Sequence, residues 1–313
     1  MTAEARPDRA TLLDGARVLV TGATGFIGRR LVDRLLRAGA EVHAIDLMPA
    51  GVVDVQEHVC DLKDAGATRA AVEASDPNIV FHLAAFKERS ATPDAFARAV
   101  LDNITGTLDL IVPLCGRPSL RSVVSVGTVE EYAGDVPPYS ETMREAPVSA
   151  YSFSKTAMVH LVQTFHRAHA LPAVIVRPTV AYGPGQATDM FIPALIASLL
   201  RGERFHMTAG EQTRDFIYVD DVVEALIAAA TTRDAVGAVF NIGSGESVTV
   251  REVAEHAETL TGGTGLLGFG DVPYRVGESM AYSVDTDAAR RMLGWAAAVS
   301  LDEGLRRTVD SFR

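Results

Sequence analysis

The sequence has few cysteines, a shortage of positive charge and no long apolar run, and each shortage excludes a class of protein. Cys60 and Cys115, the two cysteines in 313 residues, are too few for a disulfide framework and lack CxxC spacing, so we expect a reducing cytoplasmic setting. Lys and Arg number 29 against 40 Asp and Glu, a net charge of -11 that argues against nucleic acid as a partner. The apolar stretch 191–200 is too short for a membrane span, and residues 1–10 show no signal-peptide pattern.

The sequence also lacks a convincing metal-binding pattern. His166 and His169 have HxxH spacing, but no carboxylate or third ligand lies near them in the sequence. We therefore expect no metal site, and we interpret both histidines as surface or interface residues.

What the sequence does have is an alternation of short β-branched runs with amphipathic stretches. Six runs predict strands that are buried on both faces: 17–22, 41–46, 78–85, 122–127, 172–178 and 237–243. Between them lie segments such as 26–39, which has an apolar face, arginines on the opposite face and Gly39 at its end. This alternation predicts an α/β fold with a doubly wound parallel sheet of the Rossmann type.

A glycine-rich turn follows the first predicted strand. Gly22, Gly25 and Gly28 lie between that strand and the first helix. In a dinucleotide-binding turn the first glycine allows the tight turn, the second allows a pyrophosphate to approach, and the third lets the helix pack on the strand. The helix N-terminus adds N–H donors and a positive dipole, so this segment predicts a dinucleotide site.

Asp46 ends the second predicted strand, 18 residues after Gly28. A carboxylate at this place accepts hydrogen bonds from the adenosine ribose hydroxyls. Its charge would repel a 2'-phosphate, and no arginine follows it in the sequence IDLMPAG. We therefore expect NAD rather than NADP.

Asp61 follows a short third strand and has two interpretations. Its carboxylate either reaches the adenine amino group or caps the helix that begins after it. Both interpretations remain open at this point.

Four motifs together resemble the extended short-chain dehydrogenase/reductases: TGATGFIG at 21–28, HLAA at 82–85, YSFSK at 151–155 and RDFIYVDDV at 214–222. The resemblance covers nearly the whole chain. Members of this family act mostly on nucleoside-diphosphate sugars as epimerases, dehydratases or ketoreductases. They combine a Rossmann domain with a smaller C-terminal domain that binds the sugar nucleotide.

The resemblance implies an interleaved division of the chain. The expected NAD-binding domain spans residues 1–180, and residues 214–246 return to it. The expected sugar-nucleotide domain comprises residues 181–213 and 247–313. The family also implies a homodimer, formed by the helices near 92–114 and 151–169.

The expected cofactor contacts combine the turn, the strand ends and the catalytic helix. They are Gly22, Gly25, Phe26, Ile27, Gly28, Asp46, Asp61, Leu62, Leu83, Ala84, Ala85, Asn103, Tyr151, Lys155 and Pro178.

Tyr151 and Lys155 are four residues apart on a helix expected to begin near Ala150, so both side chains lie on one face. A neighbouring ammonium stabilises a phenolate, so we expect Lys155 to lower the pKa of Tyr151 and make it an acid–base group. The resemblance implies that Lys155 also binds the nicotinamide ribose. A third group should be a hydroxyl after the fourth strand: the family pattern of a Y-x-G turn selects Thr128, and Ser125 is the alternative.

Glu130 occupies the place where dehydratases of the family carry the base that removes the sugar C5 proton. In many of them an acidic or polar residue precedes it, but here that residue is Val129, which has no proton to donate. Some nucleotide-sugar reductases also carry a Glu-Glu-Tyr turn like the one from Glu130 to Tyr132. Glu130 is therefore a site residue without an assigned role.

Among the residues expected to bind the sugar nucleotide, one position differs from the usual pattern of the family. Val180 replaces an asparagine that often helps bind the sugar diphosphate. Arg214 and Arg275 remain as candidate diphosphate ligands because guanidinium groups suit phosphate oxygens. Glu278 would either orient Arg275 or accept from a ribose hydroxyl.

The first functional hypothesis is a ketoreductase that acts at C4 of a nucleoside-diphosphate 4-keto-6-deoxyhexose. The alternatives are a redox-neutral C4 epimerase with bound NAD and a 4,6-dehydratase that uses Glu130 as its base. A non-catalytic NAD-binding sensor is a remote alternative, because such proteins typically lose the tyrosine or the lysine, and Tyr151 and Lys155 are both present.

Overall fold

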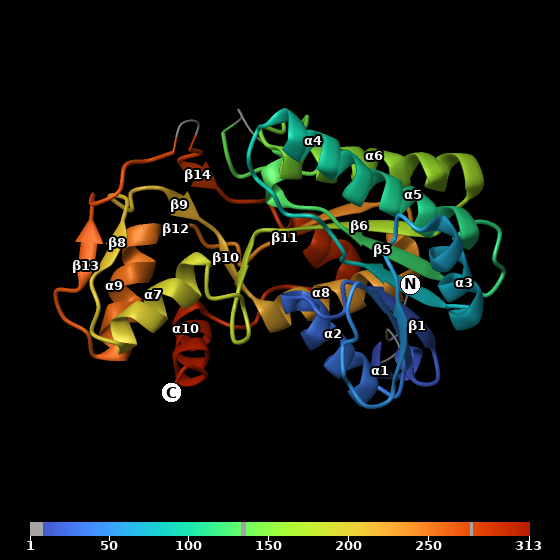
Figure 1. Ribbon diagram of the computed structural model, residues 1–313, viewed down its shortest axis with the longest axis horizontal. Coiled ribbons are helices and arrows are strands. Elements are labelled where there is room, and N and C mark those ends of the chain that lie inside the picture. Colours follow the sequence, from blue (N-terminus) through green and yellow to red (C-terminus); the bar gives the residue numbers. More distant parts are fainter. Residues whose placement is uncertain (1–8, 133–135, 276–277) are drawn as a thin grey trace, which may run out of the picture.

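The computed structural model describes residues 9–132, 136–275 and 278–313, and its centre is a seven-stranded parallel sheet (Figure 1). The strand order is β11-β6-β5-β4-β1-β2-β3. The strands are β1 (Arg17–Thr21), β2 (Glu41–Asp46), β3 (Val55–Val59), β4 (Ile79–His82), β5 (Ser122–Val126), β6 (Ala173–Pro178) and β11 (Val239–Ile242). β4, β5 and β6 are buried at every residue, as the continuous apolar runs predict. The doubly wound α/β fold is therefore confirmed.

Helices cover both faces of this sheet (Figure 1). One face carries α1 (Arg9–Leu13), α2 (Phe26–Arg37) and α8 (Val219–Thr231). The other face carries α3 (Ala65–Ser75), α4 (Pro93–Ala99), α5 (Gly106–Ile111) and α6 (Ala150–His169). A π-helical turn, η1 (Val100–Thr105), joins α4 to α5, and a short 3-10 turn, η2 (Val112–Leu114), follows α5.

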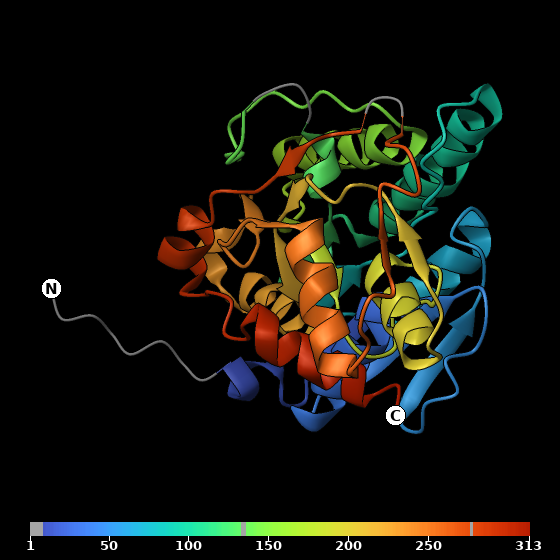
Figure 2. The same ribbon diagram turned by 90° about the vertical axis from the view of Figure 1, so that its left-hand side faces the viewer.

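A smaller lobe lies beside the sheet, on the left in Figure 1 and toward the viewer in Figure 2. Its helices are α7 (Phe191–Leu200), α9 (Val250–Thr261) and α10 (Leu301–Asp310), which share one apolar cluster. Its short strands are β8 (Phe205–Met207), β9 (Thr213–Arg214), β12 (Val248–Thr249), β13 (Leu267–Phe269) and β14 (Ala281–Tyr282). No helix in the described residues is long and apolar enough to cross a membrane.

The chain passes between the two lobes more than once. β7 (Val180–Tyr182) pairs with β10 (Phe216–Tyr218), after which α8 and β11 return to the large sheet. The π-helical turn η5 (Ala289–Leu293) also packs in the core of the large lobe. Residues from the expected smaller domain therefore reach the larger core as well.

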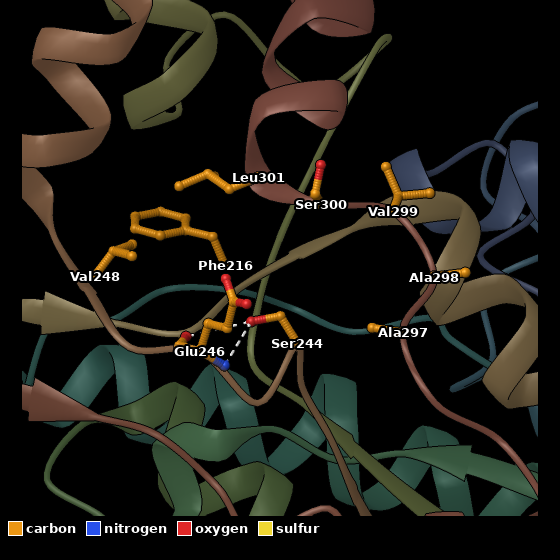
Figure 3. A pocket seen from close by; sticks show the side chains of 9 residues that line it. All are labelled: Phe216, Ser244, Glu246, Val248, Ala297, Ala298, Val299, Ser300 and Leu301. Atoms are coloured by element: carbon orange, nitrogen blue, oxygen red, sulfur yellow. Dashed lines mark hydrogen bonds between the residues drawn. The ribbon is translucent and has the colours of Figure 1, made fainter.

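A cavity of about 210 Å³ lies near these crossings (Figure 3). Phe216, Val248 and Leu301 line one side of it, and residues 297–299 line the other. Ser244 also lines the cavity, and its hydroxyl donates a hydrogen bond at 2.8 Å to Oδ1 of the buried Asp215. This cavity shares no residue with the set of site residues expected from the sequence.

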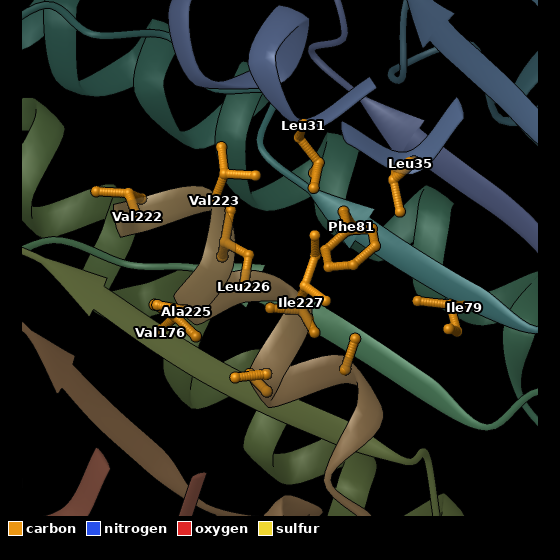
Figure 4. Packing of buried hydrophobic residues seen from close by; sticks show 14 of the residues in the cluster. Leu31, Leu35, Ile79, Phe81, Val176, Val222, Val223, Ala225, Leu226 and Ile227 are labelled. Carbon is orange, nitrogen blue, oxygen red and sulfur yellow. The ribbon is translucent and has the colours of Figure 1, made fainter. Parts of the chain in front are cut away.

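The larger apolar core lies between the sheet and the helices α2 and α8 (Figure 4). Apolar side chains of both helices pack against the strands in this core. Leu31 and Leu35 point from α2 toward Phe81 of β4, and Ile227 approaches from α8. Leu31 and Leu35 are four residues apart, so they lie on one face of the helix. α2 ends before Gly39, whose φ of +79° suits glycine, as the sequence predicts.

Candidate active site

The turn between β1 and α2 has room only for glycine at two of its positions. Gly22 has a φ of +72°, and a Cβ there would lie 2.7 Å from the backbone nitrogen of Ala84. A Cβ on Gly28 would lie 2.1 Å from the carbonyl oxygen of Gly22. The turn thus packs against the chain that leaves β4, and it closes tightly under the first turn of α2.

The N-terminus of α2 is free to bind an anion. Its N-cap residue is Gly25, which offers no side-chain hydrogen bond, and its first turn contains no acidic residue. The backbone N–H groups of Phe26 and Ile27 lie in this first turn, where they have no acceptor within the helix. A pyrophosphate fits this arrangement of donors and positive dipole.

Asp46 is tied to the same turn. Its Oδ2 accepts from the backbone nitrogen of Thr24 at 3.0 Å and from the Thr24 hydroxyl at 2.9 Å. Its Oδ1 accepts from the Leu47 nitrogen at 2.8 Å. A carboxylate has about four acceptor sites, so Asp46 retains capacity for ribose hydroxyls.

Asp61 does not cap the following helix, so that interpretation is wrong. Asp64 is the N-cap of α3, and its side chain accepts from the nitrogens of Gly66 and Ala67. Asp61 instead accepts from the Lys63 nitrogen at 3.0 Å and remains exposed. The cap falls three residues later than expected because α3 begins at Ala65. Leu62 is buried beneath this segment.

A buried hydrogen-bond chain crosses the strands behind the turn. His82 Nδ1 lies 2.8 Å from the Thr21 hydroxyl, and its Nε2 lies 2.8 Å from the Thr107 hydroxyl. The Thr107 hydroxyl donates to the Asn103 carbonyl and therefore accepts from Nε2–H. Burial, with a smaller effect of Lys155, lowers the pKa of His82 to about 3, so this histidine is neutral at physiological pH.

The remaining expected cofactor residues occupy different environments. The Asn103 amide is used inside the protein: its Oδ1 accepts from the Phe86 nitrogen, and its Nδ2 donates to the Ser154 hydroxyl at 2.7 Å. Asn103 thereby ties the loop after β4 to α6. Three half-buried residues, Leu83, Ala84 and Ala85, directly follow β4. Pro178 is buried and ends β6.

Helix α6 carries Tyr151 and Lys155 near its N-terminus, where a capping box between Ser149 and Ser152 fixes its start. Lys155 is only 2% exposed, and among the described residues its ammonium contacts the Met158 sulfur at 3.9 Å. Burial lowers the pKa of Lys155 to about 8, against the attraction of Glu131. A buried ammonium with one weak partner fits a ligand rich in hydroxyl groups, such as the nicotinamide ribose.

The ionisation of Tyr151 differs from the expectation. Burial raises the pKa of Tyr151 well above its usual value, and the Glu130 carboxylate raises it further. Arg89 and a hydrogen bond from Thr128 act in the opposite direction. The expectation of a lowered pKa for Tyr151 is therefore wrong, because desolvation and Glu130 outweigh Arg89 and Thr128.

The structure brings Thr128, rather than Ser125, to the phenol. Thr128 is the N-cap of a short turn, η3 (Val129–Glu131), and its hydroxyl accepts from the Glu130 nitrogen at 3.2 Å. Its own O–H therefore remains free to donate. Ser125 is fully buried in β5, and its hydroxyl has no hydrogen-bond partner among the described residues. Gly134, which completes the expected Y-x-G turn, lies outside the described residues.

A buried ion pair beneath this turn is absent from the sequence prediction. The Glu131 carboxylate accepts from the Thr128 nitrogen at 2.8 Å and from Arg177 Nε at 2.8 Å. Arg177 also donates to the Tyr132 hydroxyl and to Glu145. Arg177 lies inside the apolar run that forms β6, and a buried guanidinium requires acceptors. This position in the sequence could therefore have indicated that a buried acceptor exists.

Arg89 is the second site residue that sequence reasoning missed. Its guanidinium donates to both oxygens of Glu130 at 2.8–3.1 Å and lies 5.0 Å from the centre of the Tyr151 ring. No motif marks this arginine, since it belongs to an irregular loop between β4 and α4. Glu130 therefore has a charged partner that comes from 41 residues earlier in the chain.

The substrate-end residues are arranged differently from the expectation. Glu278 Oε1 accepts from Arg214 Nη2 at 2.6 Å, so it orients Arg214 rather than Arg275. The Arg214 guanidinium also lies 4.9 Å from the centre of the Tyr282 ring. Arg275 is exposed. Val180, at the position of the missing asparagine, begins β7.

Within the part of the chain that the structure describes, no group of three or more His, Cys, Asp or Glu residues is placed to hold a metal ion. His166 Nδ1 instead donates to the Leu171 carbonyl at 2.8 Å.

Comparisons with known proteins agree with this geometry. Residues 18–243 match the model of the NAD dependent epimerase/dehydratase family. A UDP-glucose 4-epimerase of Mycolicibacterium smegmatis is 33% identical, over 95% of this chain and 98% of its own. A dTDP-glucose 4,6-dehydratase of Streptomyces griseus is 32% identical, over 93% and 92%. The structure of MoeE5 with UDP-glucuronic acid and NAD is 34% identical, with a TM-score of 0.87 over 95% of this chain and 98% of MoeE5. The expected family and the expectation of NAD are confirmed.

Proposed function

The chain belongs to the NAD-dependent epimerase/dehydratase family, and on this basis we propose that it is a C4 epimerase of a nucleoside-diphosphate sugar. The observation that carries the proposal is the convergence of Thr128, Tyr151 and Lys155 beside the turn that begins at Gly22. Thr128 comes from the turn after β5, and Tyr151 and Lys155 come from the first turns of α6, near the carboxyl edge of the sheet, where ligands of such folds bind.

Each of the three side chains has a distinct task in this reaction. NAD, when bound, supplies the acceptor and donor of hydride at the sugar carbon. Tyr151 exchanges a proton with the C4 oxygen, and the free O–H of Thr128 donates a hydrogen bond to that oxygen. The Lys155 ammonium, which is buried and has a weak contact with the Met158 sulfur, binds the ribose hydroxyls.

Two features of the η3 turn weigh against a 4,6-dehydratase. Elimination requires an acid for the departing C6 hydroxyl, and Val129 cannot supply a proton. Elimination also requires a base at C5, but both carboxylate oxygens of Glu130 accept hydrogen bonds from Arg89. Proton removal from C5 by Glu130 would first require these contacts with Arg89 to be broken.

Asp46 supports an epimerase that retains its cofactor. A redox-neutral epimerase recycles bound NAD, and Asp46 favours NAD by repelling a 2'-phosphate. The relatives include epimerases that act at C4 of UDP-glucose and UDP-glucuronate.

A C4 ketoreductase is the second candidate, and the turn from Glu130 through Tyr132 favours it. Here the same residues protonate the C4 oxygen of a 4-keto sugar, and the cofactor is consumed in each turnover. The two candidates share one catalytic site and differ in net redox balance.

Exposed apolar side chains on the helices of one face support the expected homodimer. They are Val100, Leu101, Leu108, Val112 and Phe153. We propose that a second copy covers them, because such a face is otherwise in water. Sedimentation of the protein at micromolar concentration tests this: a monomer at all concentrations contradicts the proposal.

The function is tested by incubating the purified protein with UDP-, dTDP-, GDP- and CDP-sugars and following the products by NMR. An epimerase interconverts C4 epimers without net formation of NADH. Stoichiometric consumption of NADH with a 4-keto sugar supports the ketoreductase and contradicts the epimerase. Release of a 4-keto-6-deoxy sugar supports the dehydratase and contradicts both.

Matched hydroxyl variants test the catalytic assignment. Thr128→Ala removes the proposed donor and is expected to lower kcat by about 100-fold. Ser125→Ala removes a fully buried hydroxyl that has no hydrogen-bond partner, and it is expected to leave kcat within about threefold. Tyr151→Phe is expected to abolish turnover and leave NAD binding nearly intact. Equal effects of the two hydroxyl variants contradict the role of Thr128.

A further inference from the structure

Arg89 is held beside Tyr151 by a loop that is anchored at both ends. The Asn103 side chain binds the backbone nitrogen and carbonyl of Phe86, three residues before Arg89. The backbone nitrogen of Ala150 donates to the Ser90 carbonyl at 3.2 Å, immediately after Arg89. Ala150 begins α6 and directly precedes Tyr151, so the loop and the phenol are positioned together.

The Arg89 guanidinium has two partners at this position. Its Nε and Nη2 contact both oxygens of Glu130, and its central carbon lies 5.0 Å from the Tyr151 ring centre. A guanidinium that donates two or more hydrogen bonds to a carboxylate is held in a better-defined orientation than one that donates a single hydrogen bond. The Arg89 side chain is 45% exposed and that of Glu130 is 24% exposed, so solvent partly screens the pair.

The two charges act on Tyr151 in opposite directions. Glu130 raises the pKa of the phenol after the larger effect of burial, and Arg89 lowers it. Thr128 and Glu131 also act on the phenol, and Lys155 lies one helical turn after it on α6. Glu130 also acts electrostatically on Arg214 and Tyr282 of the smaller lobe. The pair is therefore the link between the phenol and the charged groups of the smaller lobe.

We propose that Arg89 is a further catalytic-site residue, which controls proton transfer at Tyr151 and holds Glu130 as its counter-ion instead of leaving it as a base. This inference rests on the proposed function, in which Tyr151 is the proton-transfer group. It assigns a role to Glu130 that differs from that of a C5 base.

Removing the positive charge of Arg89 and removing the negative charge of Glu130 should shift the pH profile in opposite directions. Arg89→Met leaves Glu130 unpaired beside the phenol and should move the Tyr151-controlled limb of the pH–kcat profile to higher pH. Glu130→Gln removes the negative charge and should move the same limb to lower pH. A unit charge about 5 Å away, partly screened by solvent, corresponds to a shift of roughly half to one pH unit. The double variant should lie between the single variants.

Arg98→Met is the matched control. Arg98 also stacks on an aromatic ring, at 4.5 Å from the centre of Phe86, and also pairs with a carboxylate, that of Asp102. Arg98 lies on α4 and is not among the groups that shift the pKa of Tyr151, so its removal should leave the pH profile unchanged. Arg89→Lys retains the charge without the fork and should recover part of the shift.

A titration that does not depend on turnover separates this inference from the proposed function. In NAD-loaded protein labelled with ¹³C-tyrosine, Tyr151→Phe assigns the ring signal of Tyr151. That signal should titrate at the lowest pH in Glu130→Gln, at an intermediate pH in the wild type and at the highest pH in Arg89→Met. This order supports the inference even where no sugar nucleotide is turned over. The same titration in all three proteins, or shifts of equal sign in both variants, overturns it.

Discussion

Gly28→Ala is expected to impair NAD binding because the added methyl group meets backbone on two sides. The new Cβ would lie 2.1 Å from the Gly22 carbonyl oxygen and 2.9 Å from the Ala23 Cα. Ordinary contact requires α2 and the turn to separate by about 1 Å, a strain of roughly 1–3 kcal/mol. The same movement displaces the N–H groups of the first turn of α2, which are proposed to bind the pyrophosphate of NAD. Loss of one charge-assisted hydrogen bond weakens binding by about 10- to 100-fold.

Gly66→Ala is the control for this variant. Gly66 also lies in the first turn of a helix, α3, but a Cβ there would meet only the Asp64 Oδ1 at 3.4 Å. Because this position is exposed, alanine should stabilise the protein by roughly 0.5–1 kcal/mol through helix propensity. Calorimetric titration with NAD and urea unfolding measure both quantities. The steric reasoning is refuted if Gly28→Ala binds NAD within twofold of the wild type.

Two further predictions concern buried and surface charge. Because the pKa of His82 is lowered to about 3, the unfolded state binds a proton that the folded state does not. The free energy of unfolding should therefore fall as pH falls from about 6.5 toward 3, by up to roughly 1.4 kcal/mol per pH unit, and His82→Gln should show a shallower slope in urea titrations. Asp46→Asn keeps an acceptor for Thr24 and removes the charge, so the ratio of NADP to NAD affinity should rise about 10-fold; an unchanged ratio in calorimetry contradicts the assigned role of Asp46.

The parts of the fold and site that sequence reasoning predicted depend on local chemistry. The buried strands follow from runs of β-branched residues, and the close approach of Gly28 to Gly22 follows from a steric limit within seven consecutive residues. The spacing of Tyr151 and Lys155 follows from the period of a helix. Each of these features is determined by residues that are near one another in the chain.

The parts that were missed depend on residues that meet only after folding. Glu131 and Arg177 are 46 residues apart, and their pairing beneath Thr128 requires β6 to lie beside β5. The ionisation of Tyr151 depends on burial and on charges from two other segments, so the helical spacing alone predicted its direction incorrectly. An arginine within an apolar strand indicates that a buried acceptor exists, but it does not identify that acceptor.

The excess of acidic residues is also seen at the candidate active site, where carboxylates pair with the arginines. The chain has a net charge of -11, and the arginines that face the cleft are already matched by carboxylates: Arg89 by Glu130 and Arg214 by Glu278. Lys155, by contrast, is buried without a carboxylate at hydrogen-bond distance, and the first turn of α2 has no acidic residue. The unmatched positive groups therefore lie at the proposed NAD site. If Arg214 binds the sugar diphosphate as proposed, the diphosphate competes with Glu278 for it, so in calorimetric titrations Glu278→Gln should change sugar-nucleotide affinity more than NAD affinity.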